Sequence, residues 1–290
     1  MKFGRLGVFT FTDTMNAAQL ADLAQRVEGL GYSTLWYPEV FHYETFGVGG
    51  YLLSKSRKLI VGSGIANIYA RDPAAAAMGH NTLNELYDGR FVLGLGVSHA
   101  PLVSGVRGHE YKRPVATMRA YLDGMDGAWN ATHTSPAGKQ VVLAALGPKM
   151  SELAGQRTLG AFPYNVTPQQ AATSRNVMGP KAAVICEQKV CLTEDPMLAR
   201  QVARANLAMY LTLPNYYENW YRLGFNESDL HNGGSDRLMD AMVLWGSAET
   251  IKSKLRAYFD RGADQVVIQP LSSSGRTEPD WKALEALASL

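Results

Sequence analysis

The chain has 290 residues with nearly balanced charge, since 28 Lys+Arg against 26 Asp+Glu give a formal net charge of +2. Its 46% hydrophobic residues exclude intrinsic disorder, and the balanced charge without a basic run argues against nucleic acid or an anionic membrane as partner. No uncharged apolar stretch reaches the roughly 18 residues of a membrane helix, and no secretory leader is recognisable, so we expect a cytoplasmic protein. Along the chain, short apolar runs alternate with amphipathic helices.

The first half of the chain divides into strand–helix units at clear local signals. Asn16 followed by Gln19 is a capping box, Gly31 is a glycine that ends a helix, and Asp72 before Pro73 is a helix cap with a first-turn proline. The predicted elements are a strand over 3–9, a helix over 16–31, strands over 32–37 and 58–65, a helix over about 72–87, a strand over 90–96 and a helix over about 115–129.

The second half continues the alternation and fixes the fold class. Its predicted elements are strands over 141–146, 159–164, 182–192 and 265–270, helices beginning at 148, 168 and 195, an aromatic segment over 215–236 and a helix over 247–262. The strands are continuous apolar runs, as expected for parallel strands buried on both faces. Eight such strands alternating with helices predict an α/β protein, a single (β/α)8 TIM barrel domain over 1–290 with 215–236 as an insertion before the last helix.

Several common kinds of site are absent from the sequence. Cys186 and Cys191, the only cysteines, lie five residues apart in one predicted strand and should point to opposite faces, so we expect no disulfide and no metal site. The glycines at 94 and 96 lack the spacing of a dinucleotide-binding fingerprint. Neither a nucleophile elbow nor a metalloprotease motif is present.

In a TIM barrel the active site lies at the carboxyl ends of the strands, which selects the residues directly after each strand. His99 follows Gly94 and Gly96, where a backbone without side chains would let a flat ligand approach, and its imidazole can donate to a carbonyl or act as a general acid. Glu39, after the second strand, is either a site carboxylate or the cap of the next turn. His99 itself can be a structural histidine, and His42 competes with it as the acid/base group.

The turn after the fifth strand predicts an anion site. Gly147 and Pro148 open a helix there and leave the amides of Lys149 and Met150 free, at the positive end of the helix dipole. Lys149 adds a charge. The residues alone therefore indicate a barrel enzyme with a phosphate-binding turn and one or two acid/base groups.

Beyond this, the sequence resembles the bacterial luciferase-like flavin and deazaflavin oxidoreductases over nearly its whole length. The segments that carry the resemblance are 61–99, 143–164 and 246–271, and 61–99 is the most specific. Within the family the chain is most similar to the branch that uses coenzyme F420, a 5-deazaflavin. The resemblance implies this cofactor, with FMN as the alternative, and a homodimer.

The resemblance also implies roles for particular residues. A bulge with a non-proline cis peptide at Gly64–Ile65 would back the cofactor ring, and Asn67 would hydrogen-bond it. Glu39 matches an Asp that contacts the polar edge of the cofactor. His99 matches the position where some deazaflavin dehydrogenases place a carboxylate acid.

The phosphate-binding turn of the family falls on the same turn that the helix dipole selects. It comprises Gly147, Pro148, Lys149 and Met150. Relatives that act on sugar phosphates have Asp-His after the second strand, where this chain has Glu39-Val40, so the substrate should differ. His99 with Glu39 could still form a proton-transfer pair.

The resulting hypothesis is an F420-dependent oxidoreductase that transfers a hydride between the deazaflavin and a small organic substrate of the alcohol/ketone or enone type. An FMN-dependent monooxygenase is the alternative, and a non-catalytic flavin-binding barrel the second alternative. The aromatic residues at 215–225 either close over the substrate or pack on the surface. The substrate and the reaction direction are not determined by the sequence.

Overall fold

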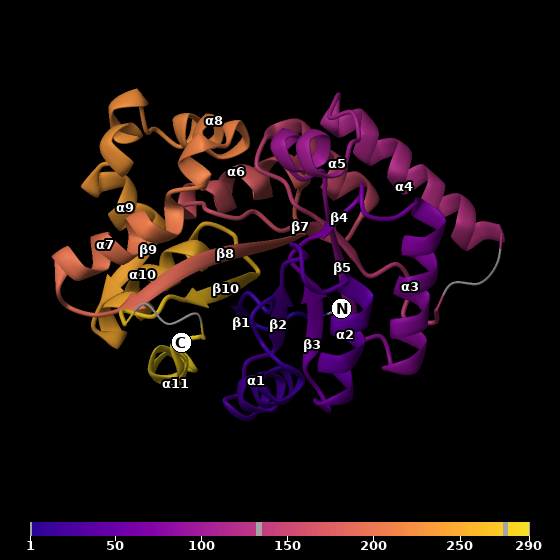
Figure 1. The fold of residues 1–290 in the computed structure, drawn as a ribbon, viewed down its shortest axis with the longest axis horizontal. Helices are drawn as coiled ribbons and strands as arrows, with labels where there is room; N and C mark the ends of the chain where they lie inside the picture. Colours follow the sequence, from indigo (N-terminus) through magenta and orange to yellow (C-terminus); the bar gives the residue numbers. More distant parts are fainter. Residues whose placement is uncertain (1, 132–134, 275–277, 290) are drawn as a thin grey trace.

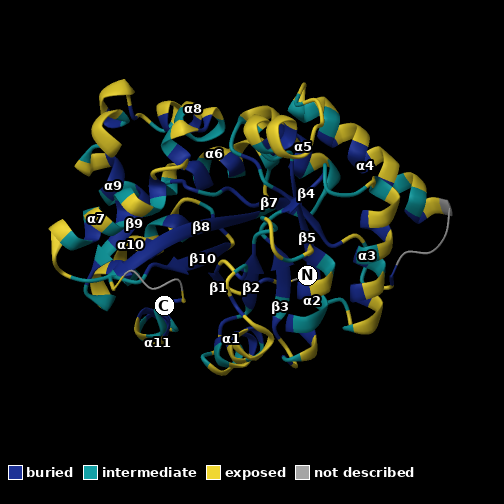
Figure 2. Cartoon of the chain, in the orientation of Figure 1, coloured by how far each residue is buried: buried dark blue, intermediate teal, exposed yellow. Residues whose placement is uncertain are grey.

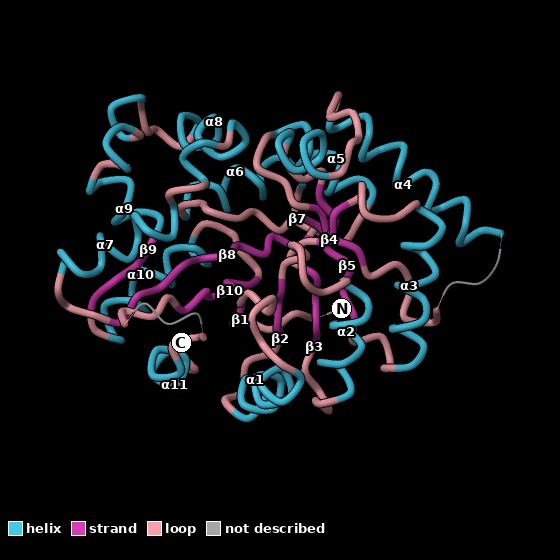
Figure 3. Tube along the Cα trace, in the orientation of Figure 1, coloured by secondary structure: helices cyan, strands magenta, loops and turns pink. Residues whose placement is uncertain are grey.

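The structure is a computed structural model that describes residues 2–131, 135–274 and 278–289 (Figure 1). Strands lie in the centre with helices around them (Figure 3). Because β10 pairs with both β1 and β8, the parallel strands close into a barrel, which confirms the predicted TIM-barrel fold. The barrel strands in order are β1 (Leu6–Phe9), β2 (Thr34–Tyr37), β3 (Ile60–Ser63), β5 (Phe91–Gly96), β6 (Val141–Leu143), β7 (Gly160–Ala161), β8 (Ala183–Leu192) and β10 (Gln265–Pro270).

The predicted helices begin where the sequence signals place them. Asn16 and Gln19 form the predicted capping box, and the side chains of Asp72 and Ser247 accept the expected backbone hydrogen bonds. The helices that cover the barrel are α1 (Ala17–Gly29), α2 (Thr45–Ser54), α3 (Pro73–Leu86), α4 (Pro114–Ala131), α5 (Pro148–Arg157), α6 (Pro168–Met178), α10 (Ala248–Asp260) and α11 (Trp281–Leu287).

Two of these helices were not predicted. The segment of α2 contains three glycines and no polar face, and α11 is only seven residues long, so neither shows a helical pattern in the sequence. Both form because the barrel covers their apolar side chains. Leu52 and Leu53 of α2 and Leu284 of α11 are fully buried. The helix over 247–262 is therefore not the last one, because α11 follows β10.

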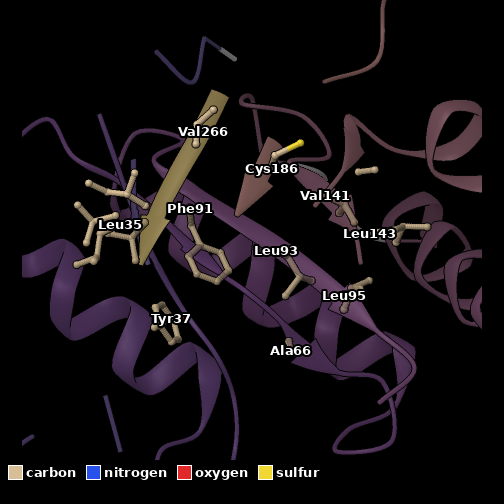
Figure 4. Packing of buried hydrophobic residues seen from close by; sticks show 14 of the residues in the cluster. Leu35, Tyr37, Ala66, Phe91, Leu93, Leu95, Val141, Leu143, Cys186 and Val266 are labelled. Carbon is tan, nitrogen blue, oxygen red and sulfur yellow. The ribbon is translucent and has the colours of Figure 1, made fainter. Parts of the chain in front are cut away.

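The barrel strands divide the core into two layers, and both faces of the strands are buried (Figure 2). Phe91, Leu93 and Leu95 follow one another along one side of β5, in the layer between the strands and the helices (Figure 4). The interior layer contains apolar side chains from strands all around the barrel. Among them are Trp36 and Phe162, whose ring centroids lie 4.6 Å apart. The barrel interior is therefore a packed core and not a channel.

A long excursion leaves the barrel after β8 and returns before α10. It contains α7 (Pro196–Leu207), α8 (Pro214–Arg222), α9 (Asp236–Met242), three-residue helical turns at Tyr210–Thr212, Glu227–Asp229 and His231–Gly233, and β9 (Val243–Gly246), which pairs with β8. It extends beyond the insertion predicted at 215–236 because α7 and α9 belong to it. The amphipathic pattern of α7 predicts its apolar face but not the surface it packs on, here a second core around Trp220, Leu238 and Met239.

The remaining details concern short elements and absences. A two-residue strand, β4 (Ala66–Asn67), pairs with the end of β5, and a π-helical turn spans Pro101–Val106. Both cysteines are buried and unbridged. In the described ranges, no helix is long and apolar enough to cross a membrane, and no group of three metal-binding side chains gathers.

Candidate active site

The predicted site residues gather around two adjoining cavities at the carboxyl ends of the barrel strands. One, here called the apolar cavity, has a volume of about 190 Å³ and is lined by Glu39, Gly64 and Asn67, among others. The second, here called the α5 cavity, has a volume of about 480 Å³ and is lined by the four residues of the 147–150 turn. Ile65 and His99 line both. Also shared are Ser98, Ala144, Phe162, Tyr164 and Tyr216.

A larger cavity of about 810 Å³ lies beside the site, between the ends of β1 and β10 and helix α7. Its lining includes Asp13 and Gln269 but none of the predicted cofactor or catalytic residues. The convergence of those residues on the two adjoining cavities identifies the latter as the candidate site.

The peptide bond between Gly64 and Ile65 is cis, as the family resemblance predicts. The glycines opposite it have a further role besides the one expected. A Cβ on Gly96 would overlap the Ile65 side chain, and a Cβ on Gly94 would overlap the carbonyl oxygen of Ser63. These glycines therefore make room for the bulge at 64–65, which lines the apolar cavity together with Gly96.

Glu39 is held by a dense set of hydrogen bonds. Its carboxylate accepts from both terminal nitrogens of Arg71, from the Asn67 amide at 2.9 Å and from the Thr45 amide at 3.2 Å. The two side chains are 5% and 11% exposed, so this is a nearly buried ion pair. His99 is not among the partners of Glu39, and this carboxylate is placed to brace the chain after β3.

Asn67 is fixed by that bracing. Its backbone amide donates to Glu39, and its Oδ1 accepts a hydrogen bond from the Tyr69 amide at 2.9 Å. With Oδ1 engaged, the Nδ2 group is the part of the side chain that can donate to a ligand. This orientation agrees with the predicted hydrogen bond from Asn67 to a cofactor ring.

His99 is the predicted acid/base group, and the structure places it at both cavities. Burial lowers the pKa of its imidazole, opposed in part by a hydrogen bond with Asn215 of α8 that raises it. The ring of Tyr216 lies beside it, with centroids 5.5 Å apart. Its Nδ1 is buried with no hydrogen-bond partner among the described residues. Burial thus favours the neutral imidazole, and one of its two ring nitrogens is buried without a partner.

The competing histidine lies elsewhere. His42 is exposed and packs edge-on against Tyr43, with ring centroids 4.5 Å apart. It lines neither of the two site cavities. The geometry thus favours His99 over His42 as the acid/base group.

The amino end of α5 has the features of an anion site. Gly147 is its cap residue and makes no side-chain capping bond, and Pro148 follows at the first helical position. Lys149 and Arg222 both line the α5 cavity, and Arg222 lies beside Gly147. Free amides at a helix N-terminus with two nearby cations favour a phosphate group.

The sequence reasoning missed the residues that the excursion and β8 bring to the site. Asn215 hydrogen-bonds both His99 and Tyr111, and neither contact has a sequence signal. Glu187 and Lys189 form a fully buried ion pair in β8, with Nζ 3.1 Å from Oε1 and 3.8 Å from the Tyr164 ring centroid. Two charges in an otherwise apolar buried strand are a signal that could have revealed this pair.

Several known proteins are similar to this chain in sequence. Residues 1–265 match the sequence profile of a family described as luciferase-like monooxygenase. A Mycobacterium tuberculosis protein provisionally named a coenzyme F420-dependent oxidoreductase is 23% identical, over 92% of this chain and 94% of that protein. The 5,10-methylenetetrahydromethanopterin reductase of Methanolobus tindarius is 24% identical, over 86% of this chain and 89% of the reductase.

A solved structure agrees in fold. An F420-dependent secondary alcohol dehydrogenase in complex with an F420-acetone adduct superposes with a TM-score of 0.77, covering 99% of this chain and 98% of the dehydrogenase. The sequence identity is 15%, so this likeness establishes the shared barrel fold and not the reaction.

Proposed function

The chain belongs to the luciferase-like monooxygenase family, and on that premise we propose that it is a coenzyme F420-dependent oxidoreductase. It transfers a hydride between the deazaflavin and a small organic substrate of the alcohol/ketone or enone type. The name of the Mycobacterium tuberculosis relative agrees with the cofactor, and the name of the Methanolobus tindarius relative agrees with a reduction.

The observation that best supports the proposal is that the apolar cavity and the α5 cavity adjoin and share lining residues. The α5 cavity ends at an uncapped helix N-terminus with Lys149 and Arg222 beside it, which fits the phosphate of a cofactor. The apolar cavity contains Gly64, Ile65 and Asn67, which fit a flat ring with a polar edge. A ligand that spans both cavities must pass His99 and Ile65, because these residues line both.

When bound, the deazaflavin supplies a hydride donor or acceptor, and the protein supplies binding, orientation and proton transfer. The neutral imidazole of His99 accepts the hydroxyl proton of an alcohol, or returns it to a carbonyl in the reverse direction. Asn215 holds the imidazole ring, and Tyr216 excludes water from one side of it. Glu39 acts through its hydrogen bond to the amide of Asn67, with Arg71 compensating its charge; its direct contact with the cofactor stays a prediction.

Cofactor titration tests the proposal. Purified protein is titrated with F420 and with FMN while cofactor fluorescence is followed, and the loaded protein is then assayed for hydride exchange with alcohols and ketones. We expect F420 to bind and to be reduced by an alcohol. Tight FMN binding without F420 binding would instead support the FMN-dependent monooxygenase. The description of the family as luciferase-like monooxygenase is the observation that favours this alternative. F420 binding without turnover by any donor would indicate a non-catalytic barrel.

Removal of the imidazole separates catalysis from binding. His99→Ala should lower kcat by about 100-fold or more, the usual contribution of a positioned acid/base group. The Kd for F420 should change less than about threefold. Equal loss of kcat and of cofactor affinity would contradict an acid/base role for His99.

A matched variant keeps the imidazole but removes its partner. In Asn215→Ala the hydrogen bond that raises the pKa of His99 is lost, so the acidic limb of the kcat/KM profile should move to lower pH. Glu218→Ala, on the exposed side of the same helix, serves as the control. A merely structural role for Asn215 would lower the rate at every pH without moving the limb.

We also propose that residues 1–290 act as a single-domain cytoplasmic homodimer. The family resemblance supports the homodimer, and the closed barrel supports the single domain. Light scattering of the purified protein, with 31.6 kDa expected for one chain, measures the assembly directly.

A further inference from the structure

Four exposed hydrophobic side chains stand where the apolar cavity opens to solvent. Phe11, Phe41, Val106 and Met209 line this cavity and are 37%, 70%, 63% and 59% exposed; together they are called the rim. The other five large exposed hydrophobic side chains of the described residues lie on the outer helices α3, α6, α7 and α8. Scattered exposed apolar residues are ordinary, whereas a cluster at a cavity indicates an interaction.

The rim residues come from four separate segments, and three of these segments have contacts that hold them in place. Phe11 packs edge-on against the buried Phe9, with centroids 5.7 Å apart. The amide of Phe41 donates to Asp13 Oδ2 at 3.3 Å, which joins the loops after β1 and β2. Met209 precedes Tyr210, whose hydroxyl lies 3.1 Å from that of Tyr164. The rim is thus a built surface and not a set of loose loop ends.

The cavity beneath the rim suits a neutral and short reacting group. Its volume of about 190 Å³ leaves room for only a small group beside the cofactor ring that the proposed function places against Gly64, Ile65 and Asn67. The charge of Glu39 is compensated by Arg71, and the only other ionised side chain in the lining, Arg107, is exposed to solvent. Because the proposed function assigns the α5 cavity to the phosphate of the cofactor, a substrate longer than a few carbon atoms extends from the apolar cavity across the rim.

We propose that the substrate is a neutral alcohol or ketone that carries an extended apolar arm, and that this arm lies across the rim formed by Phe11, Phe41, Val106 and Met209. The identity of the reacting group as an alcohol or ketone rests on the proposed function. The surface that would bind the arm, here called the arm site, consists only of side chains of this chain, so binding measurements alone can test it.

Binding of a homologous series tests the arm site. The Kd values of 2-alkanones with four, six, eight and ten carbons are measured by calorimetry, with F420-loaded protein and with the protein alone. A fully buried methylene strengthens binding by about fourfold, so a half-open rim should strengthen it by about twofold per methylene. A Kd that does not change with chain length would overturn the proposal.

Paired variants assign the effect to the rim. Phe41→Ser with Met209→Ser should flatten the dependence on chain length, while Met197→Ser, an 81% exposed methionine on α7, should leave it unchanged. An unchanged slope in the double variant would contradict the proposal. So would a parallel loss of F420 affinity, which would place the cofactor on the rim, or a change of molecular mass by light scattering, which would make the rim an interface between copies.

The two proposals fail separately. If F420 does not bind but the protein alone shows the chain-length slope and loses it in the double variant, the proposed function is wrong and the arm site stands. If F420 binds and is reduced but no slope appears, the function stands and the arm site is wrong.

Discussion

At the scale of the residue, His80 shows how one buried ring makes stability depend on pH. Its Nε2 accepts a hydrogen bond from the Gln140 amide at 3.0 Å, and its ring lies edge-on to Trp129. Burial lowers the pKa of His80 from 6.5 to about 4. As pH falls from 6.5 toward 4, His80 becomes protonated in the unfolded chain but stays neutral in the folded protein. This histidine should therefore lower the free energy of unfolding by about 3 kcal/mol over this window, and it contributes no pH dependence above it.

Urea unfolding at pH 7 and at pH 4.5 measures this loss. His80→Gln, which keeps a hydrogen-bond acceptor but cannot take up the proton, should remove most of the difference between the two pH values. His231→Gln, at an exposed histidine, should retain it. The same pH dependence in wild type and His80→Gln would rule out His80 as the source.

The residue scale also separates what the sequence can predict from what it cannot. His99 could be placed at the site because parallel strands end on one side of a barrel. The partner of Glu39 could not be predicted, because Arg71 lies 32 residues away and reaches it only through the fold. The same holds for Asn215, whose contact with His99 depends on how the excursion packs.

At the scale of the element, the buried pair in β8 ties the barrel to the excursion. Lys189 Nζ donates to Asn165 Oδ1 at 2.5 Å, Glu187 Oε2 accepts from the Asn165 amide, and the Asn165 carbonyl accepts from the Trp220 indole of α8. Burial raises the pKa of Glu187 and lowers that of Lys189, so each charge depends on its partner. The pair therefore holds α8, with Asn215 and Tyr216, over the site.

Lys189→Met should lower the free energy of unfolding by about 3–5 kcal/mol, because it leaves a carboxylate buried without its partner. Adding Glu187→Gln should restore part of the loss, since the double variant buries no charge. Both are measured by urea unfolding at pH 7. Lys112→Met breaks an exposed pair with Glu110 and should leave the unfolding midpoint unchanged. An equally small effect of Lys189→Met would show that the buried pair contributes little.

Elements differed in how well the sequence predicts them, and the cause is physical. Each predicted barrel strand contains an observed one, because a strand buried on both faces must be apolar throughout. β9 was missed although it is largely buried, because it follows α9 without a turn signal and only its pairing with β8 makes it a strand. The helix caps are local signals and were predicted correctly, whereas the assignment of α7 to the excursion depends on contacts distant in sequence.

At the scale of the whole molecule, the net charge of +2 conceals a local concentration of positive charge. Lys149 and Arg222 come from α5 and α8, and both face the cavity at the amino end of α5. We expect each of Lys149→Ala and Arg222→Ala to weaken F420 binding by about fivefold, because two unit charges 4 Å apart in water interact by about 1 kcal/mol. The Kd of the wild type should rise with salt, and less steeply in the variants.

Fluorescence titration with F420 at 50 and 500 mM NaCl checks both expectations. Lys181→Ala, an exposed lysine that precedes β8 at the other end of the strands, is the matched control and should bind as the wild type does. Equal salt dependence in all four proteins would mean that the phosphate is held elsewhere.

The route of the excursion has a consequence for how such a barrel can diversify. The chain departs after Leu192 and returns at Gly246, and these two residues are register partners in adjacent parallel strands. A segment whose two ends already lie together can be lengthened, shortened or exchanged without moving the strands that carry Gly64, Ile65 and His99. Substrate preference can therefore evolve by exchange of parts of residues 193–245, provided that the new segment again supplies a cation beside Gly147 and a hydrogen-bond partner for His99.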